Sequence, residues 1–359
     1  MSVFRFLHLS DLHIAGEANR YSLIDSYHPI ATTFKSFANF QSPLKIPSHD
    51  ARAARALANQ LSQEKGQYDA ILISGDLATT GLDEDIQAAY NYLHGKLRQT
   101  KEIIEEIHPI CDVAKLIWMP GNHDRYHDHL CNPGCRRFEK ENYFGEKWRK
   151  SDQLLTDLGT KNGPVHSYHM AKDDRVLTII CVDFSFQKSD FPKHIGRGIV
   201  LEDVLIELEK VTLKSKEKYK ETAIIWVSHF PPKFPRVADS LMLENEENLL
   251  KLAEKLDISI ILSGHTHEAI EYDVPMESKN IRVICCGTSL EHQANNPKLS
   301  LQIIEIDISN FRQVELKFIR LFWRKEKGNI NENITLKIEK GKIKYGFKPW
   351  EIATIAVKN

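Results

Sequence analysis

The sequence has no apolar run as long as the roughly 18 or more residues that a membrane-spanning helix needs. The first expected strand starts at Val3 and contains Arg5, so the N-terminus lacks the pattern of a signal peptide. We therefore expect a cytoplasmic protein that makes no contact with a membrane. Of its 359 residues, 42% are hydrophobic, which is enough for a large core.

Cysteines are few, and they lack the spacing of a disulfide framework, so a disulfide-stabilised secreted fold is not expected. Most of them should be reduced and buried. Cys131 and Cys135 form a C-x3-C pair in a loop with Arg and His, where a structural zinc and a disulfide both remain open. The six are Cys111, Cys131, Cys135, Cys181, Cys285 and Cys286.

Net charge is almost absent, at −1, which argues against a uniformly basic nucleic-acid-binding protein. The charge is nevertheless segregated. Residues 311–359 contain 12 Lys or Arg against 5 Asp or Glu, a net charge of +7, so the remainder carries −8. The pattern there predicts two or three exposed strands. They either bind a polyanion, such as nucleic acid, or use lysines to protect a sheet edge.

Polar metal-ligand residue types follow five short apolar segments. A short Ile/Leu/Val-rich run predicts a strand buried on both faces, and the Gly, Ser or Pro after it turns the chain out of the sheet. Ligands of such sheets bind beyond the carboxyl ends of the strands, so these side chains should meet there. The segments are 6–14, 70–77, 116–124, 223–232 and 258–268. The candidates are Asp11, His13, Asp76, Asn122, His123, Asp124, His229, His265 and His267.

The chemistry of these side chains indicates a metal centre. Carboxylate, amide and imidazole donors without cysteine favour Mn, Fe, Zn or Mg over a thiolate site. The donors are too many for one ion. Two ions about 3.5–4 Å apart, bridged by a carboxylate, are typical of phosphatases and nucleases. We therefore expect a hydrolase with two divalent ions, of which Mn, Fe and Zn are the main candidates.

The order D-x-H, G-D, G-N-H-D, His before Pro and G-H-x-H resembles the calcineurin-like metallophosphoesterase superfamily, from about residue 4 to about residue 290. The resemblance implies two ligand sets that share Asp76 as the bridge. It implies one ion on Asp11, His13, Asp76 and His267, and another on Asp76, Asn122, His229 and His265.

The resemblance also implies a catalytic role for His123, which would assist the leaving-group oxygen as a general acid or charge stabiliser while Asp124 orients its ring. An imidazole titrates near neutral pH and suits that task. The nucleophile would be a hydroxide formed from water held between the two ions. The sequence departs from the family at Thr79, where many members have an acid.

Secondary-structure patterns predict an α/β fold. Apolar residues recur at helical spacing in four segments, and further strands are expected at 175–184 and 281–286. The result should be a four-layer αββα sandwich of two mixed sheets with a small C-terminal β extension. The expected helices are 50–64, 83–107, 201–220 and 244–257. The expected domains are 1–305, with insertions at about 15–49 and 125–163, and the extension 306–359.

Both insertions are candidates for substrate contact. Segment 15–49, with Phe34, Phe37 and Phe40, is either a lid over the site or a loop that these rings anchor. Arg125 opens the second insertion and is either a phosphate clamp or a solvated arginine.

Three functions remain to be compared. The first is a phosphodiesterase of a small nucleotide, like the cyclic-nucleotide branch of the family. The second is a DNA nuclease like the repair-exonuclease branch, which also begins H-x-S-D-x-H. The third is a scaffold that has kept the fold without activity. A scaffold predicts lost ligands, whereas every ligand position is filled here. The natural substrate and the oligomeric state are left open.

Overall fold

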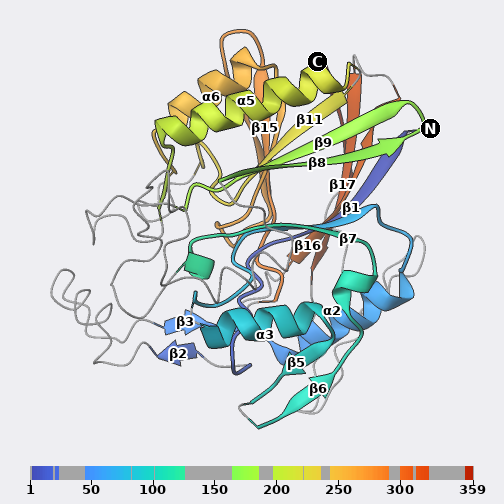
Figure 1. Cartoon of the computed structure of the whole chain (residues 1–359), viewed down its shortest axis with the longest axis vertical. Coiled ribbons are helices and arrows are strands. Elements are labelled where there is room, and N and C mark those ends of the chain that lie inside the picture. The colour runs from blue at the N-terminus through green and yellow to red at the C-terminus, as the bar shows by residue number, and fades with distance from the viewer. Residues whose placement is uncertain are drawn as a thin grey trace, which may run out of the picture.

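Two six-stranded β-sheets lie face to face in the middle of the molecule, and helices cover their outer faces (Figure 1). The structure is a computed structural model of the chain. It describes residues 2–18, 21–23, 45–81, 83–100, 102–125, 164–185, 197–220, 222–235, 243–290, 300–309, 313–322 and 352–358.

The first sheet combines the N-terminal strands with the C-terminal ones. Strands β1, β4 and β7 are parallel, whereas β16, β17 and β18 add to the β1 side in antiparallel pairs. Its order is β18 (Ile352–Lys358), β17 (Gln313–Phe322), β16 (Ser300–Asp307), β1 (Val3–Leu9), β4 (Ala70–Ser74) and β7 (Lys115–Met119). Part of the predicted C-terminal extension therefore continues this sheet.

The second sheet has four parallel strands between two antiparallel edge strands. Its order is β14 (Ile270–Pro275), β15 (Asn280–Cys285), β13 (Ile260–Ser263), β11 (Thr222–Ser228), β9 (Arg175–Val182) and β8 (Val165–Lys172). Smaller ribbons pair β2 (Tyr21–Leu23) with β3 (Lys45–Pro47), β5 (Lys96–Arg98) with β6 (Ile104–Glu106), and β10 (Gly198–Ile199) with β12 (Leu243–Glu244).

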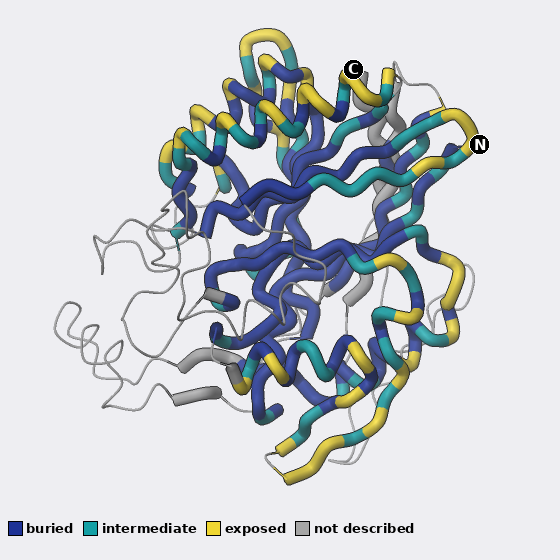
Figure 2. Tube along the Cα trace, in the orientation of Figure 1, coloured by how far each residue is buried: buried dark blue, intermediate teal, exposed yellow. Residues whose placement is uncertain are grey.

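The apolar runs are buried on both faces because each sheet lies between its partner sheet and a helix layer (Figure 2). In β1, Phe4 and Phe6 pack between the sheets, and Leu7 and Leu9 pack under the helices. The helices are α2 (Ala51–Gln63) and α3 (Asp83–Leu93) on the first sheet, and α5 (Glu202–Lys218) and α6 (Glu246–Lys255) on the second. The predicted αββα sandwich is confirmed.

Local signals place three helices where the sequence predicts them. The side chain of Asp50 accepts the amides of residues 52 and 53 and so caps α2. Both α5 and α6 begin with acids and end with lysine, as the helix dipole favours. Short 3-10 turns occur at Ile110–Asp112 and His123–Arg125. Among the described helices, none is long and apolar enough to cross a membrane.

The helix predicted over 83–107 is wrong beyond residue 93, because the chain continues as the β5–β6 hairpin. Gly95 has a φ of 91°, a left-handed conformation that ends helices. A Cβ at this position would also lie 2.8 Å from the carbonyl oxygen of Ile107. The apolar residues after Gly95 therefore belong to a hairpin.

Candidate metal centre

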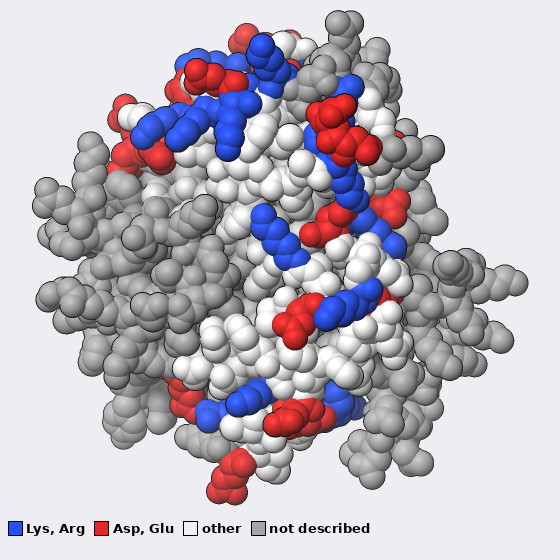
Figure 3. Space-filling view, turned by 45° about the vertical axis from the view of Figure 1, so that its right-hand side comes forward, with Lys and Arg blue, Asp and Glu red and all other residues white. Residues whose placement is uncertain are grey.

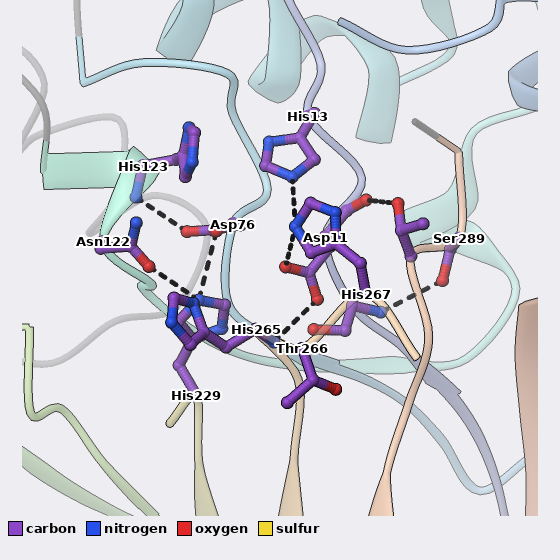
Figure 4. Close-up of polar contacts among 12 residues, drawn as sticks. Asp11, His13, Asp76, Asn122, His123, His229, His265, Thr266, His267 and Ser289 are labelled. Atoms are coloured by element: carbon purple, nitrogen blue, oxygen red, sulfur yellow. Dashed lines mark hydrogen bonds and ion pairs between the residues drawn. The ribbon is translucent and has the colours of Figure 1, made fainter. Parts of the chain in front are cut away.

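The predicted ligands lie together at the carboxyl ends of five strands (Figure 4). Three of the loops leave the first sheet and two leave the second, so the site spans the ends of both sheets. Asp11 and His13 follow β1, Asp76 follows β4, Asn122 and His123 follow β7, His229 follows β11, and His265 and His267 follow β13.

We call Asp76, Asn122, His229 and His265 the His229 group. The Nε2 atom of His229 lies 3.2 Å from Oδ2 of Asp76 and 3.1 Å from Oδ1 of Asn122. Its Nδ1 atom lies 2.8 Å from the carbonyl oxygen of Ser74, to which it donates. That contact directs Nε2 toward the two oxygens. Three atoms that can bind a metal ion, Nε2 of His229, Oδ2 of Asp76 and Oδ1 of Asn122, therefore lie close together.

We call Asp11, His13, Asp76 and His267 the Asp11 group. The Nε2 atoms of His13 and His267 lie 3.4 Å apart, and Nε2 of His267 lies 3.2 Å from Oδ1 of Asp11. The other oxygen of Asp11 accepts the backbone amide of His265 at 3.0 Å. One carboxylate oxygen is thus fixed by the backbone, and the other faces the imidazoles.

These residues fit two metal ions. Among the described residues, Oδ1 of Asp11, Oδ2 of Asp76 and Nε2 of His265 are buried and make no hydrogen bond, although each of the two carboxylate oxygens faces an imidazole nitrogen at 3.2 Å. Buried polar atoms without partners are rare, and a cation would satisfy all three. Ligands lie about 2.0–2.2 Å from such ions, so donor atoms about 3 Å apart can share one. Three donor triads have ligand atoms that lie within 4.8 Å of one another: Asp11/His13/His267, His13/Asp76/His123 and Asp76/His229/His265.

The backbone is strained at five of the ligands. Asp11, His13, Asp76, His265 and His267 have φ values of 51°, 50°, 51°, 66° and 54°. A left-handed conformation at a residue other than glycine costs about 1–3 kcal/mol and persists only where the surroundings hold it. The fold therefore keeps the ligands in place against local relaxation.

Glycines in the motifs allow the loops to approach one another. A Cβ at Gly121 would collide with the Asp76 carboxylate and lie 2.8 Å from Nε2 of His229. A Cβ at Gly75, which has a φ of 104°, would likewise collide with the ring of His229. The Gly of G-D and the Gly of G-N-H-D are therefore required by close packing around the His229 group.

Electrostatics prepares the donors for a cation. Burial raises the pKa of Asp76, but the charges of His229 and His123 outweigh burial and hold that pKa well below its usual value. Burial lowers the pKa of His229, yet the charges of Asp76 and Asp11 raise it to about 9. Burial and the charge of His229 lower the pKa of His265 to about 3. Binding of a metal ion to the His229 group would therefore compete with a proton on His229.

His123 lies beside both groups. Its backbone amide donates to Oδ1 of Asp76 at 2.8 Å, and its ring packs edge-on against His13 with centroids 4.6 Å apart. Its Nδ1 atom lies 2.8 Å from the carbonyl oxygen of Thr79 and donates to it, which orients the ring. The side chain of Thr79 donates to the carbonyl of His13 at 2.6 Å. Thr79 thus connects His123 to the His13 loop.

Asp124 has a different place from the one predicted, because its carboxylate accepts three backbone amides. The donors are Leu77 at 3.2 Å, Ala78 at 2.7 Å and Gly121 at 2.9 Å. Burial, with the charge of Asp76, raises the pKa of Asp124 to about 7. Asp124 joins the G-D loop to the G-N-H-D loop, and the contact that orients His123 comes from the carbonyl of Thr79.

Sequence reasoning missed Thr288 and Ser289, which bind the Asp11 loop. The hydroxyl of Thr288 donates to the carbonyl of Asp11 at 2.8 Å, and the amide of Ser289 donates to Ser10 at 2.9 Å. They follow strand β15 with Gly and small polar residues, the same pattern that marks the ligand loops. That pattern was the available signal.

Other predictions have separate outcomes. His8, which also follows apolar residues, is buried, and its ring hydrogen bonds to Ser74 and Gln302 outside the two ligand groups. The predictions for Phe34, Phe37, Phe40, the side chain of Arg125, Cys131 and Cys135 lie outside the described residues.

The sandwich and its two groups of buried donors are those of a metallophosphoesterase. The calcineurin-like phosphoesterase family matches residues 4–269, which include every predicted ligand, so the chain belongs to that family. A search of curated proteins found no match.

Solved structures similar to this chain share little sequence with it. GAP50, the anchor in the inner membrane complex of Plasmodium, is 15% identical over 95% of this chain and 90% of that chain, with a TM-score of 0.47. A putative 5′-nucleotidase from Staphylococcus aureus is 15% identical over 85% and 51%, with a TM-score of 0.43. Zinc-bound Vps29 from Entamoeba histolytica is 10% identical over 99% of both chains, with a TM-score of 0.36.

Proposed function

We propose that this protein is a phosphodiesterase that uses two divalent ions, Mn, Fe or Zn, to hydrolyse a phosphate diester of a nucleotide. The observation that carries the proposal is that Asp76 belongs to a donor triad with His229 and His265 and also to one with His13 and His123. Two ions held in this way would activate the attacking water and neutralise charge on the phosphoryl oxygens.

The chain's own residues supply positioning and proton transfer. One oxygen of Asp76 is fixed by the amide of His123, and its other oxygen lies 3.2 Å from Nε2 of His229. His123, held through Nδ1 by the carbonyl of Thr79, would present Nε2 to the leaving-group oxygen and donate a proton. The buried His229 group would hold one ion away from bulk water.

A diester substrate is supported by the opening H-x-S-D-x-H, formed by His8, Ser10, Asp11 and His13. The same opening resembles the cyclic-nucleotide and the repair-exonuclease branches of the family, both of which act on diesters. His8 contributes by binding Ser74 at 2.9 Å, and the carbonyl of Ser74 in turn binds His229.

The test compares bis(p-nitrophenyl) phosphate with p-nitrophenyl phosphate as substrates. The protein is stripped of metal, reloaded with Mn²⁺ and assayed beside Asp76→Ala. We expect faster hydrolysis of the diester and no activity from the variant. Faster hydrolysis of the monoester would replace the proposal with a phosphatase, and full activity in Asp76→Ala would exclude the two-ion centre.

A DNA nuclease is the second candidate, and the basic segment 311–359 favours it. Strands β17 and β18 from this segment extend the sheet that carries Asp11. The Lys and Arg side chains of this segment lie outside the described residues, and on the face in Figure 3 the described Lys and Arg side chains are interspersed with Asp and Glu. Cleavage of single-stranded DNA, together with a binding constant whose logarithm falls linearly with the logarithm of salt concentration, would support the nuclease.

A scaffold without activity is opposed by the complete set of donors in both groups. The metal content of the purified protein distinguishes a scaffold from a phosphodiesterase or a nuclease. Protein that retains no divalent ion after dialysis against Mn²⁺ would support the scaffold.

A further inference from the structure

A short segment after β15 joins the two sheets beside the metal centre. At its start, the backbone amide of Cys286 donates to the carbonyl of Ser263 at 2.8 Å, at the end of the strand that precedes His265 and His267. At its end, the amide of Asp50 donates to the carbonyl of Leu290 at 2.7 Å. Residues 286–290, which we call the brace, lie beyond the part of the chain matched by the family.

Between these ends, the brace binds the loop that carries Asp11. The backbone of Ser10 is held on both sides, because its amide donates to Oγ of Ser289 at 3.1 Å and its carbonyl accepts the amide of Ser289 at 2.9 Å. The next carbonyl, that of Asp11, accepts the hydroxyl of Thr288 at 2.8 Å. Figure 4 shows Ser289 on the Asp11 side of the site.

These contacts fall where the backbone needs support. Asp11 is in the left-handed region, and a conformation of this kind persists only when its surroundings determine it. Both hydroxyl-bearing residues are buried, with exposures of 1% for Thr288 and 0% for Ser289. Loss of either hydroxyl would leave a buried backbone group without its partner, and the loop would relax to recover one.

The brace also sets a distance across the site. One end is bonded to the strand before His267, and the middle is bonded to the loop of Asp11. Asp11 and His267 face each other at 3.2 Å and are both in the Asp11 group. The His229 group meets Asp11 through the amide of His265 at 3.0 Å, whereas its His229 is held by Ser74 and faces Asn122 of the G-N-H-D loop.

We propose that Thr288 and Ser289 are positioning residues that set the affinity of the Asp11 group for its ion. The inference rests on the two-ion centre proposed above. It adds a selective effect, because removal of these hydroxyls should weaken one ion site and spare the other. Changes to groups that orient metal ligands typically reduce metal affinity by about 10–100-fold.

The experiment measures Mn²⁺ binding by isothermal titration calorimetry with the full-length, metal-stripped chain. Thr288→Val and Ser289→Ala are compared with the wild type. Thr288→Ser keeps the hydroxyl and should restore binding. Ser215→Ala is the matched control, because the buried hydroxyl of Ser215 donates to a backbone carbonyl, that of Val211, at 2.8 Å in α5. Circular dichroism verifies that each variant is folded.

We expect two sites in the wild type, Thr288→Ser and Ser215→Ala. In Thr288→Val and Ser289→Ala, one site should weaken by about 10–100-fold while the other is unchanged. Unchanged affinity at both sites in folded variants would overturn the inference, and so would equal weakening of both sites. A wild type that binds no Mn²⁺ would overturn the two-ion centre itself, and the inference with it.

Discussion

The two ligand groups of the metal centre differ in how far they are enclosed. In the His229 group, every member is buried, and the most exposed is His265 at 5%. In the Asp11 group, Asp11 and His13 are buried, whereas the side chain of His267 is 30% exposed. The difference indicates that two ions held by these groups would not be equivalent. We expect the ion in the His229 group to bind tightly and the other to exchange with solution.

The groups also differ in what supports them. The His229 group is surrounded by motif residues, since Gly75 and Gly121 pack directly against His229. The Asp11 group depends in addition on the brace, which contacts Asp11 and Ser10 from the other end of the sequence. The His229 group is therefore supported by residues of the sequence motifs, whereas the Asp11 group also needs residues 286–290, which lie outside those motifs.

Removal of the shared ligand should have the largest effect. Asp76→Asn keeps the shape of the side chain but removes its charge from both groups, so both ions should be lost. Turnover should fall by more than about 100-fold, beyond the effect of losing a group that only orients a ligand. Metal content by mass spectrometry and turnover of the diester measure this. Asp174→Asn, at an exposed turn, is the control. One ion retained in Asp76→Asn would contradict the shared role.

Removal of a ligand from one group should separate the two ions. His229→Ala should lose the tightly bound ion, whereas His267→Ala should lose the exchangeable ion and keep the other. The reason is that each imidazole belongs to one group only, with its nearest carboxylate at 3.2 Å. Ions per chain after exhaustive dialysis measure the outcome. The same metal content in both variants would show that the groups do not differ.

Removal of the His123 side chain, which lies beside both ligand groups, should leave both ions bound. In His123→Ala we expect two ions per chain and a turnover lower by about 10²–10⁴-fold, because a general acid is lost. The turnover of a substrate whose leaving group needs no proton should fall less in this variant. His94→Ala, which removes an exposed histidine, is the control. A variant that loses metal would instead assign His123 to a ligand group.

A fall in pH should have a smaller effect, on the free energy of unfolding. This effect arises from His8, which is buried near both groups. Burial lowers the pKa of His8 from 6.5 to about 3, despite the charge of Asp11. Between these values the unfolded chain binds a proton that the folded chain does not, so the stabilisation is complete above pH 6.5 and is lost as the pH falls toward 3.

Urea unfolding of metal-free protein at a series of pH values tests this dependence. The difference in free energy of unfolding between the wild type and His8→Gln should shrink as the pH falls from 6.5. His94→Gln should show no such trend. A constant difference for His8→Gln would mean that His8 is not buried as a neutral ring.

Much of this protein could be predicted from patterns along the chain. Each ligand follows a run that is buried on both faces, and that local pattern places donors such as Asp76 and His265 at strand ends. The same logic gives the two sheets and three of the four helices. Such predictions succeed because burial and periodicity are properties of neighbouring residues.

Contacts between loops that are distant in the sequence could not be predicted in this way. Thr79 replaces Asp124 as the partner of His123, and Ser289 reaches Ser10 across 279 positions. Which carbonyl faces which donor depends on how the two sheets are aligned and how strained loops pack between them. No local pattern encodes that alignment, because it follows from the packing of the whole core.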